Sequence, residues 1–140
     1  IYSLSLHDAL PILSTEIIGL SHLEREIIAN VVRYNIRDFD YDMMQLETEA
    51  GQDLAGVSDR TAITILIAKL TAILRLANSM DKTHKSKLID CRMAVREGQL
   101  VITTGYKGDL ALESASFEQK AAFFEEIFGI RPVLKQKRRV

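Results

Sequence analysis

The residues best suited to do chemistry follow a long apolar segment. Arg75, Lys82, His84 and Lys85 are basic, and Asp81 lies among them. Clustered cationic donors can hold phosphate oxygens through charge-assisted hydrogen bonds, which makes these four residues candidates for an anion site. The alternative is a helix terminus whose basic side chains offset the macrodipole and help to satisfy the last carbonyl groups. The residue types alone favour this structural interpretation, and both remain open.

The same stretch does not form a clear metal or catalytic site. Asp81 and His84 are three residues apart and could share a helix face, but a divalent metal needs several ligands and no second pair is evident. The chain has no glycine-rich loop before a helix and no Gly-x-Ser-x-Gly turn. We therefore expect no catalytic residue, no metal ligand and no cofactor.

His7 and Asp8 look like the start of a histidine-aspartate metal site, but we set them aside. Residues 5–12, Ser-Leu-His-Asp-Ala-Leu-Pro-Ile, resemble the translation of a short-read sequencing adaptor. Sequence of this kind is excluded before a fold is considered. We expect residues 1–13 to be an artefact without order and the protein itself to begin near Ser14.

Composition is that of a soluble globular protein, and we expect the protein in the cytoplasm. The 140 residues are 47% hydrophobic and 26% charged, which allows one ordinary domain or two small ones. A net charge of −1 gives no overall attraction to nucleic acid. Cys91 is the only cysteine, which excludes an internal disulfide, and Lys69 and Arg75 interrupt the best candidate for a membrane span. We interpret the basic end of the chain as solvated rather than as a nucleic-acid arm: Lys135, Lys137, Arg138 and Arg139.

The first half of the chain has helical patterns. Ser21 and Glu24 have the spacing of a capping box, which predicts a helix that begins there and ends near Tyr34. Apolar residues at helical spacing predict a second helix over 41–50 and a third over 58–80.

The pattern changes to strand-like alternation after Lys87. Apolar residues at every second position predict a half-buried strand and its core-facing side: Ile89, Cys91, Met93 and Val95. Further strands are expected over 100–104, 110–113 and 130–134. Ser116 and Gln119 form a second capping box for a helix that Gly129 ends. The fold class is α+β, with a helical domain over 14–86 and a small βββαβ domain over 87–140.

Three segments carry a resemblance to a known family. They cover 19–34 (Gly-Leu-Ser-His-Leu-Glu-Arg-Glu-Ile-Ile-Ala-Asn-Val-Val-Arg-Tyr), 69–84 (Lys-Leu-Thr-Ala-Ile-Leu-Arg-Leu-Ala-Asn-Ser-Met-Asp-Lys-Thr-His) and 117–134 (Phe-Glu-Gln-Lys-Ala-Ala-Phe-Phe-Glu-Glu-Ile-Phe-Gly-Ile-Arg-Pro-Val-Leu). In this order they resemble the C-terminal region of the exopolyphosphatase/guanosine pentaphosphate phosphohydrolase (Ppx/GppA) family, clostridial type. The resemblance implies that the helical part is an HD-like domain.

The resemblance also implies that the chain is a fragment of a hydrolase. Members of the family carry two amino-terminal actin-like domains, which release terminal phosphate from polyphosphate or pppGpp with Mg²⁺. Neither domain fits in this chain, so we expect it to be inactive alone. In the family, the C-terminal regions flank the catalytic cleft, help to bind long polyphosphate and support dimers.

Two positions depart from the family pattern. Many members have His where this chain has Asn35, and Asp where it has Asn78. The second position resembles the last metal-binding Asp of true HD enzymes, and an amide brings no charge to a dication. The resemblance therefore implies no metal site and no second phosphohydrolase centre here.

Three functional hypotheses follow from these residues. The first is an accessory polyphosphate-binding and dimerisation fragment whose polyanion contacts are Arg75, Lys82, His84 and Lys85. The second is a purely structural interdomain or dimerisation module without a ligand, and a residual HD-type metal phosphohydrolase ranks last. The expected partners are the missing N-terminal catalytic domains, polyphosphate and a second copy of the chain, but neither membrane nor nucleic acid.

Overall fold

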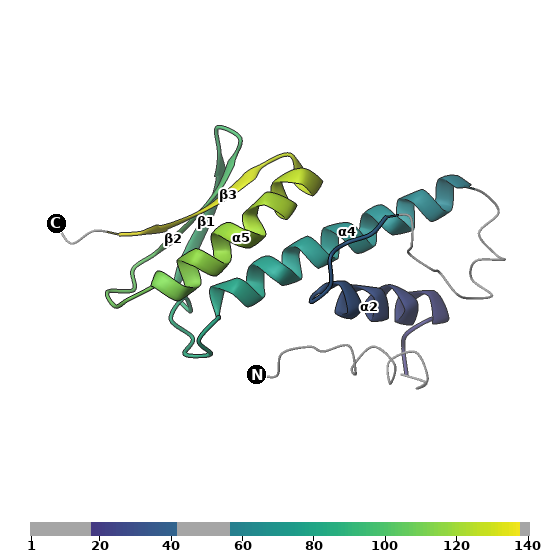
Figure 1. The fold of residues 1–140 in the computed structure, drawn as a ribbon, viewed down its shortest axis with the longest axis horizontal. Coiled ribbons are helices and arrows are strands. Elements are labelled where there is room, and N and C mark those ends of the chain that lie inside the picture. Colours follow the sequence, from purple (N-terminus) through teal and green to yellow (C-terminus); the bar gives the residue numbers. More distant parts are fainter. Residues whose placement is uncertain (1–17, 42–56, 138–140) are drawn as a thin grey trace. The chain divides into compact units, whose positions relative to one another are not determined.

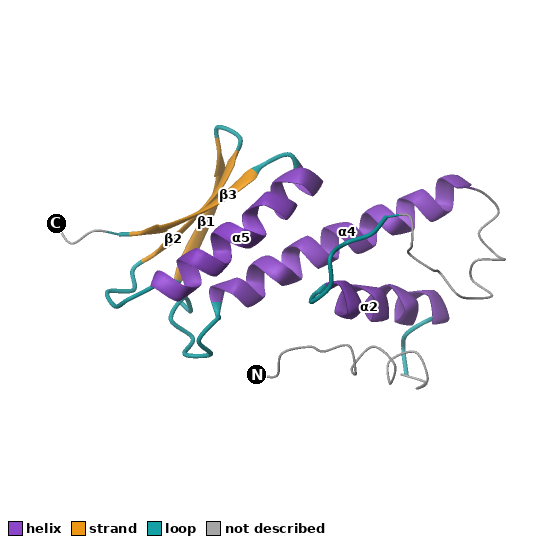
Figure 2. Cartoon of the chain, in the orientation of Figure 1, coloured by secondary structure: helices purple, strands orange, loops and turns teal. Residues whose placement is uncertain are grey.

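The computed structural model describes residues 18–41 and 57–137. The chain divides into two compact units, with the boundary between Thr71 and Ala72. The described elements, labelled in Figure 1 and coloured by type in Figure 2, are α2 (His22–Tyr34), α4 (Val57–Met80), β1 (Cys91–Arg96), β2 (Gln99–Thr104), α5 (Ala111–Phe128) and β3 (Arg131–Gln136). Helices and a mixed sheet confirm the predicted α+β class, whereas the HD-like assignment stays a prediction. The adaptor-like segment and the predicted helix over 41–50 lie outside the described residues, apart from Tyr41.

Unit 1 contains α2 and the first part of α4. The backbone N–H of Glu24 donates to Ser21 Oγ at 3.2 Å, and Glu24 Oε2 accepts from the Ser21 N–H at 2.7 Å. This reciprocal pair confirms the predicted capping box, and α2 ends at Tyr34 as expected. The small core of the unit has Tyr34 and Ile67 at its centre, with apolar side chains around them: Ile27, Val31, Phe39 and Ile63.

Unit 2 is a three-stranded sheet with α5 against one face. The strand order is β1-β2-β3: β1 and β2 form an antiparallel hairpin, and β3 pairs in parallel with β2 after the α5 crossover. Figures 1 and 2 show α5 on one side of the sheet. Phe117 and Ile102 are almost completely buried between the two layers, with Phe124 beside them and Ala72 and Leu76 from α4.

The prediction of a third strand over 110–113 is wrong, because α5 already begins at Ala111. The Ala111 N–H donates to Asp109 Oδ1 at 2.9 Å, which satisfies a donor of the first helical turn. Ser116 therefore lies inside the helix rather than at its start. The unit is ββαβ, not βββαβ. The helix ends as predicted, because Gly129 has a φ of 71° and its N–H donates to the Glu125 carbonyl at 2.8 Å.

The strand predicted after Lys87 is present as β1, but its expected burial is wrong. Ile89 precedes the strand and is 79% exposed, while Met93 and Val95 are 60% and 63% exposed. Cys91 alone of the four predicted residues packs against the core. The reason is topological: β1 is an edge strand, and α5 packs mainly against β3 and reaches Ile102 in β2.

Within the described residues, the Arg60–Met80 part of α4 is long and apolar enough to cross a membrane, with a mean hydropathy of 1.5 over its most apolar window. A helix in a protein core passes the same test. Ile67 is buried in the core of unit 1, and Ala72 and Leu76 are buried in the core of unit 2. Other apolar side chains of α4 are exposed, among them Ile65 and Ile73, so the expectation that the chain does not span a membrane stays a prediction.

Candidate functional site

Arg75 does not lie free at the end of α4. Its guanidinium group stacks over the ring of Phe123 in α5, 4.7 Å from the ring centroid. A cation over an aromatic face is held there by the ring quadrupole. Arg75 is thus turned towards α5, whereas the other three predicted residues belong to the loop that follows α4.

That loop is organised by Asp81. Its Oδ1 atom accepts from the Ser86 N–H at 2.9 Å, and its backbone carbonyl accepts from the His84 N–H at 3.0 Å. The Nδ1 atom of His84 lies 4.0 Å from Asp81 Oδ2, and both His84 and Ser86 have positive φ angles. Asp81 therefore builds the turn. Lys82, His84 and Lys85 are exposed on it, so their role in anion contact stays a prediction.

A buried carboxylate attaches the same loop to α5. Glu113 is 1% exposed; its Oε1 accepts from Thr83 Oγ1 at 2.5 Å and lies 3.2 Å from Lys87 Nζ. The Lys87 ammonium also donates to the Asp109 carbonyl at 2.9 Å. Burial raises the pKa of the Glu113 carboxyl. The hydrogen bonds from Thr83, from its own backbone and from Lys87, with the charge of Lys87, outweigh this effect and leave the pKa below its ordinary value.

A hollow beside this carboxylate exposes one of the predicted cations. Lys85 and Lys87 line a shallow hollow of about 320 Å³ together with Asp90 and Tyr106. Because Lys87 is already bound to Glu113 and Asp109, Lys85 is the basic group that this hollow presents to solvent. The hollow therefore provides one cation from the predicted set.

The open face of the sheet carries a larger basic surface, which the sequence pattern alone does not reveal. Alternate residues of each strand point to this face, and strand pairing sets Arg92 opposite Thr103 and Thr103 opposite Lys135. A second row begins with Arg96 opposite Gln99. Between these polar rows lies an apolar one: Ala94, Val101 and Val133.

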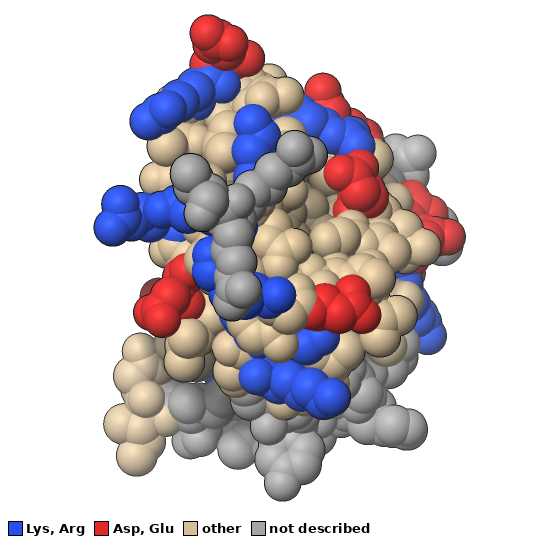
Figure 3. Space-filling model, turned by 90° about the vertical axis from the view of Figure 1, so that its left-hand side faces the viewer, with Lys and Arg blue, Asp and Glu red and all other residues tan. Residues whose placement is uncertain are grey.

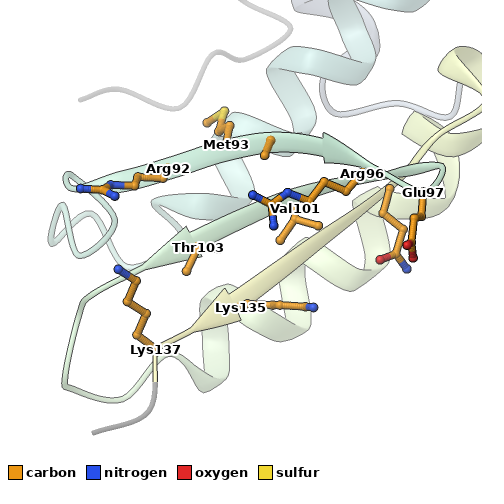
Figure 4. A pocket seen from close by; sticks show the side chains of 10 residues that line it. Arg92, Met93, Arg96, Glu97, Val101, Thr103, Lys135 and Lys137 are labelled. Carbon is orange, nitrogen blue, oxygen red and sulfur yellow. The ribbon is translucent and has the colours of Figure 1, made fainter. Parts of the chain in front are cut away.

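We call the exposed cations of this surface the basic face: Arg92 and Arg96 from β1, Lys135 from β3, and Lys137 just after it. They surround an open hollow of about 600 Å³, and Figure 4 shows them extending from the same side of the three strands. In Figure 3, Lys and Arg side chains (blue) and Asp and Glu side chains (red) are interspersed on the side of the molecule that faces the viewer. One carboxylate, that of Glu97 in the hairpin turn, also lines the hollow.

The chemistry of the basic face suits phosphate groups better than bases. Its lining residues include two arginines, whose planar guanidinium groups match phosphate geometry, and two lysines. The residues that line the hollow include no aromatic ring on which a base could stack. The surface can therefore contact a linear polyanion along its charged backbone.

The structure also changes the interpretation of the basic end of the chain. β3 continues to Gln136, two residues beyond its predicted end, so Lys135 is held in a strand instead of a solvated tail. Lys137 follows the strand, and its N–H donates to the Thr104 carbonyl at 2.9 Å. Arg138 and Arg139 lie outside the described residues.

In the part of the chain that the structure describes, no three or more His, Cys, Asp or Glu side chains are grouped so that they could hold a metal ion. Cys91 is a half-buried free thiol. Neither a protein-family model nor a curated protein matches this sequence.

Proposed function

We propose that this chain binds inorganic polyphosphate, or a polyanion of similar linear form, through the basic face of unit 2. The observation that carries the proposal is the placement of Arg92, Arg96, Lys135 and Lys137 on one exposed side of a sheet. Strands lie about 4.8 Å apart, so a row across three strands offers cations at both ends of a span of roughly 10 Å. A flexible chain of phosphates can contact both ends at once.

The sequence resemblance suggests the kind of enzyme to which this binding activity would belong. We propose that the chain is a C-terminal accessory region of an exopolyphosphatase or guanosine pentaphosphate phosphohydrolase. Hydrolysis of the terminal phosphate, with Mg²⁺, would belong to the N-terminal catalytic domains of such an enzyme. The role of this region would be to hold the length of polymer that extends beyond the catalytic cleft.

Binding of long-chain polyphosphate at several salt concentrations tests the proposal. A contact between a cation and a phosphate releases a counterion, so affinity falls as salt rises. For a single-stranded polyanion, the logarithm of the binding constant falls by about 0.7 per contact for each tenfold increase in salt concentration. The double substitution Arg92→Ala/Arg96→Ala should weaken binding and reduce the salt slope by roughly 1.4 if each arginine contacts one phosphate.

Two charge-matched variants make the test specific. Lys69→Ala/Lys107→Ala removes two exposed cations that do not line the hollow and should leave the salt slope nearly unchanged. Lys82→Ala/Lys85→Ala removes two of the cations predicted from sequence and tests whether the loop after α4 also contributes. Unchanged binding in the Arg92/Arg96 variant would contradict the proposal, and an equal loss in the Lys69/Lys107 variant would reduce it to nonspecific charge attraction.

The structural hypothesis without a ligand remains the second candidate. Exposed apolar side chains on β1 favour it, since Met93 and Val95 are more than half exposed. If it is correct, the chain self-associates and polyphosphate of any length leaves its amide chemical shifts unchanged.

A further inference from the structure

The outer edge of the sheet at β1 is a second surface without an assigned role. Among the described residues, β1 pairs with β2 on one side and with no strand on the other. An open edge presents backbone N–H and C=O groups that can pair with another strand. Proteins usually protect such edges with prolines, bulges or charged side chains; residues 91–96 contain no proline but include Arg92 and Arg96, whose charges a pairing strand must match.

Exposed apolar side chains on the helix-facing side of β1 can pack against a partner at this edge. Met93 and Val95 are 60% and 63% exposed, because α5 covers the other strands and leaves β1 largely uncovered. Cys91 continues the same row and packs against the core. The edge therefore combines unpaired backbone groups with an exposed apolar row, and a second strand with the same pattern would cover both.

We propose that the occupant is β1 of a second copy of this chain, paired antiparallel about a twofold axis with Met93 opposite Met93. In this register Cys91 faces Val95 of the second copy, so the apolar rows of the two copies are continuous. Arg92 faces Ala94 of the second copy, and Arg96 faces Asp90. The opposite charges of Arg96 and Asp90 meet twice, once on each side of the axis.

Other symmetric registers oppose like charges or lose pairs. A twofold axis centred on Arg92 places Arg92 opposite Arg92, and one centred on Ala94 places Arg92 opposite Arg96. Like charges directly opposite each other on neighbouring strands are destabilising. A register centred on Val95 leaves Asp90 and Cys91 beyond the paired segment. Charge complementarity thus selects the register centred on Met93.

Pairing in this register has a geometric consequence for the surface of the sheet. Directly opposed residues in an antiparallel pair lie on the same face, so the basic faces of the two copies lie on the same side. Arg92 and Arg96 of both copies then occupy the middle of a six-stranded sheet. The association itself does not depend on the proposed polyphosphate binding and is tested without any polyanion.

Sedimentation velocity of the whole chain over a concentration series measures the association. The wild type should show a concentration-dependent monomer–dimer equilibrium. Val95→Lys should shift it to monomer by placing a charge in the apolar row. Leu112→Lys is the matched control, because Leu112 on α5 is similarly exposed, at 62%, and does not lie on β1. Circular dichroism confirms that each variant is folded.

A charge exchange tests the register. Arg96→Glu places two carboxylates opposite each other on both sides of the axis and should raise the dimer dissociation constant about tenfold. The double variant Asp90→Lys/Arg96→Glu restores opposite charges and should recover most of this loss. A wild type that is monomeric at every concentration, equal effects of the Val95 and Leu112 substitutions, or no recovery in the double variant would each overturn the proposal.

Discussion

The buried pair of Lys87 and Glu113 gives the sharpest prediction about stability. Lys87→Met keeps the length of the side chain and removes the ammonium that lies 3.2 Å from Glu113 Oε1. The lysine side chain is 13% exposed and the glutamate 1%, so water cannot replace the lost partner. A hydrogen bond to a buried charge contributes about 1.5–3 kcal/mol, and Lys87 donates to both Glu113 and Asp109. We expect the free energy of unfolding of unit 2 to fall by roughly 2–4 kcal/mol.

Urea denaturation followed through the amide signals of β2 measures this change in unit 2 alone. Arg131→Met is the matched control, because Arg131 also bridges two carboxylates, Glu118 at 3.3 Å and Glu125 at 3.0 Å, in an exposed setting. Its loss should have only a small effect that decreases with salt. A Lys87→Met effect below about 0.5 kcal/mol would refute the reasoning, since the buried pair would then contribute no more than a surface pair.

The same pair predicts a dependence of stability on pH. The pKa of Glu113 is lower in the folded protein than its ordinary value, so its ionised form stabilises the folded state. This contribution is complete above the ordinary glutamate pKa and is lost as the pH falls through the lower folded value. Glu113→Gln should therefore be less stable than wild type at neutral pH and lose less stability on acidification. Parallel acid profiles for the two proteins would contradict this assignment.

Three further substitutions test local features. Gly129→Ala should cost unit 2 about 1–2 kcal/mol, because a side chain is strained at a φ of 71° although nothing crowds the position; no change in the urea midpoint would contradict this. Ser21→Ala should weaken α2 by about 1 kcal/mol, because the hydrogen bond from the Glu24 N–H to the serine hydroxyl is lost. Faster hydrogen exchange of the amides in the first turn measures this loss, whereas Ser21→Asp should keep their protection from exchange. Phe117→Ala should cost roughly 3–5 kcal/mol, since the ring is fully buried, and a much smaller loss of unfolding free energy would mean that the core collapses around the gap.

Features of the fold that depend on neighbouring residues were predictable from the sequence. The capping box of Ser21 and Glu24 and the left-handed glycine at 129 each need only a few adjacent residues, and both are confirmed. The hairpin of β1 and β2 also follows from local alternation around Glu97 and Gly98. These elements are the ones in which local preference and final structure agree.

The error over 110–113 arose from interactions that sequence spacing does not reveal. Leu-Ala-Leu-Glu alternates like a strand, yet Glu113 is buried against Thr83 and Lys87, which are 30 and 26 residues away. A helix brings this carboxylate to its partners, and the alternation is coincidental. No pattern in the sequence marks Glu113 as buried, because acidic residues are usually exposed.

The candidate site shows the same limit. Arg92 and Arg96 were recognisable as the polar side of a strand, and Lys135 as part of a basic end. Their shared surface depends on the parallel pairing of β2 with β3, which places Thr103 next to Lys135 across a crossover helix. Without that register, the cations belong to separate segments and indicate only exposure to water.

The parallel position of β3 also has a consequence for how unit 2 acquires its structure during synthesis. Pro132 and Leu134 complete the sheet beside β2, and they are made after every other element of the unit. Until β3 has left the ribosome, β2 has one open side and α5 lacks the strand against which it mainly packs. The hairpin and α5 therefore cannot complete their packing before this last strand is available, and the open edge of β2 is a site for aggregation in that interval.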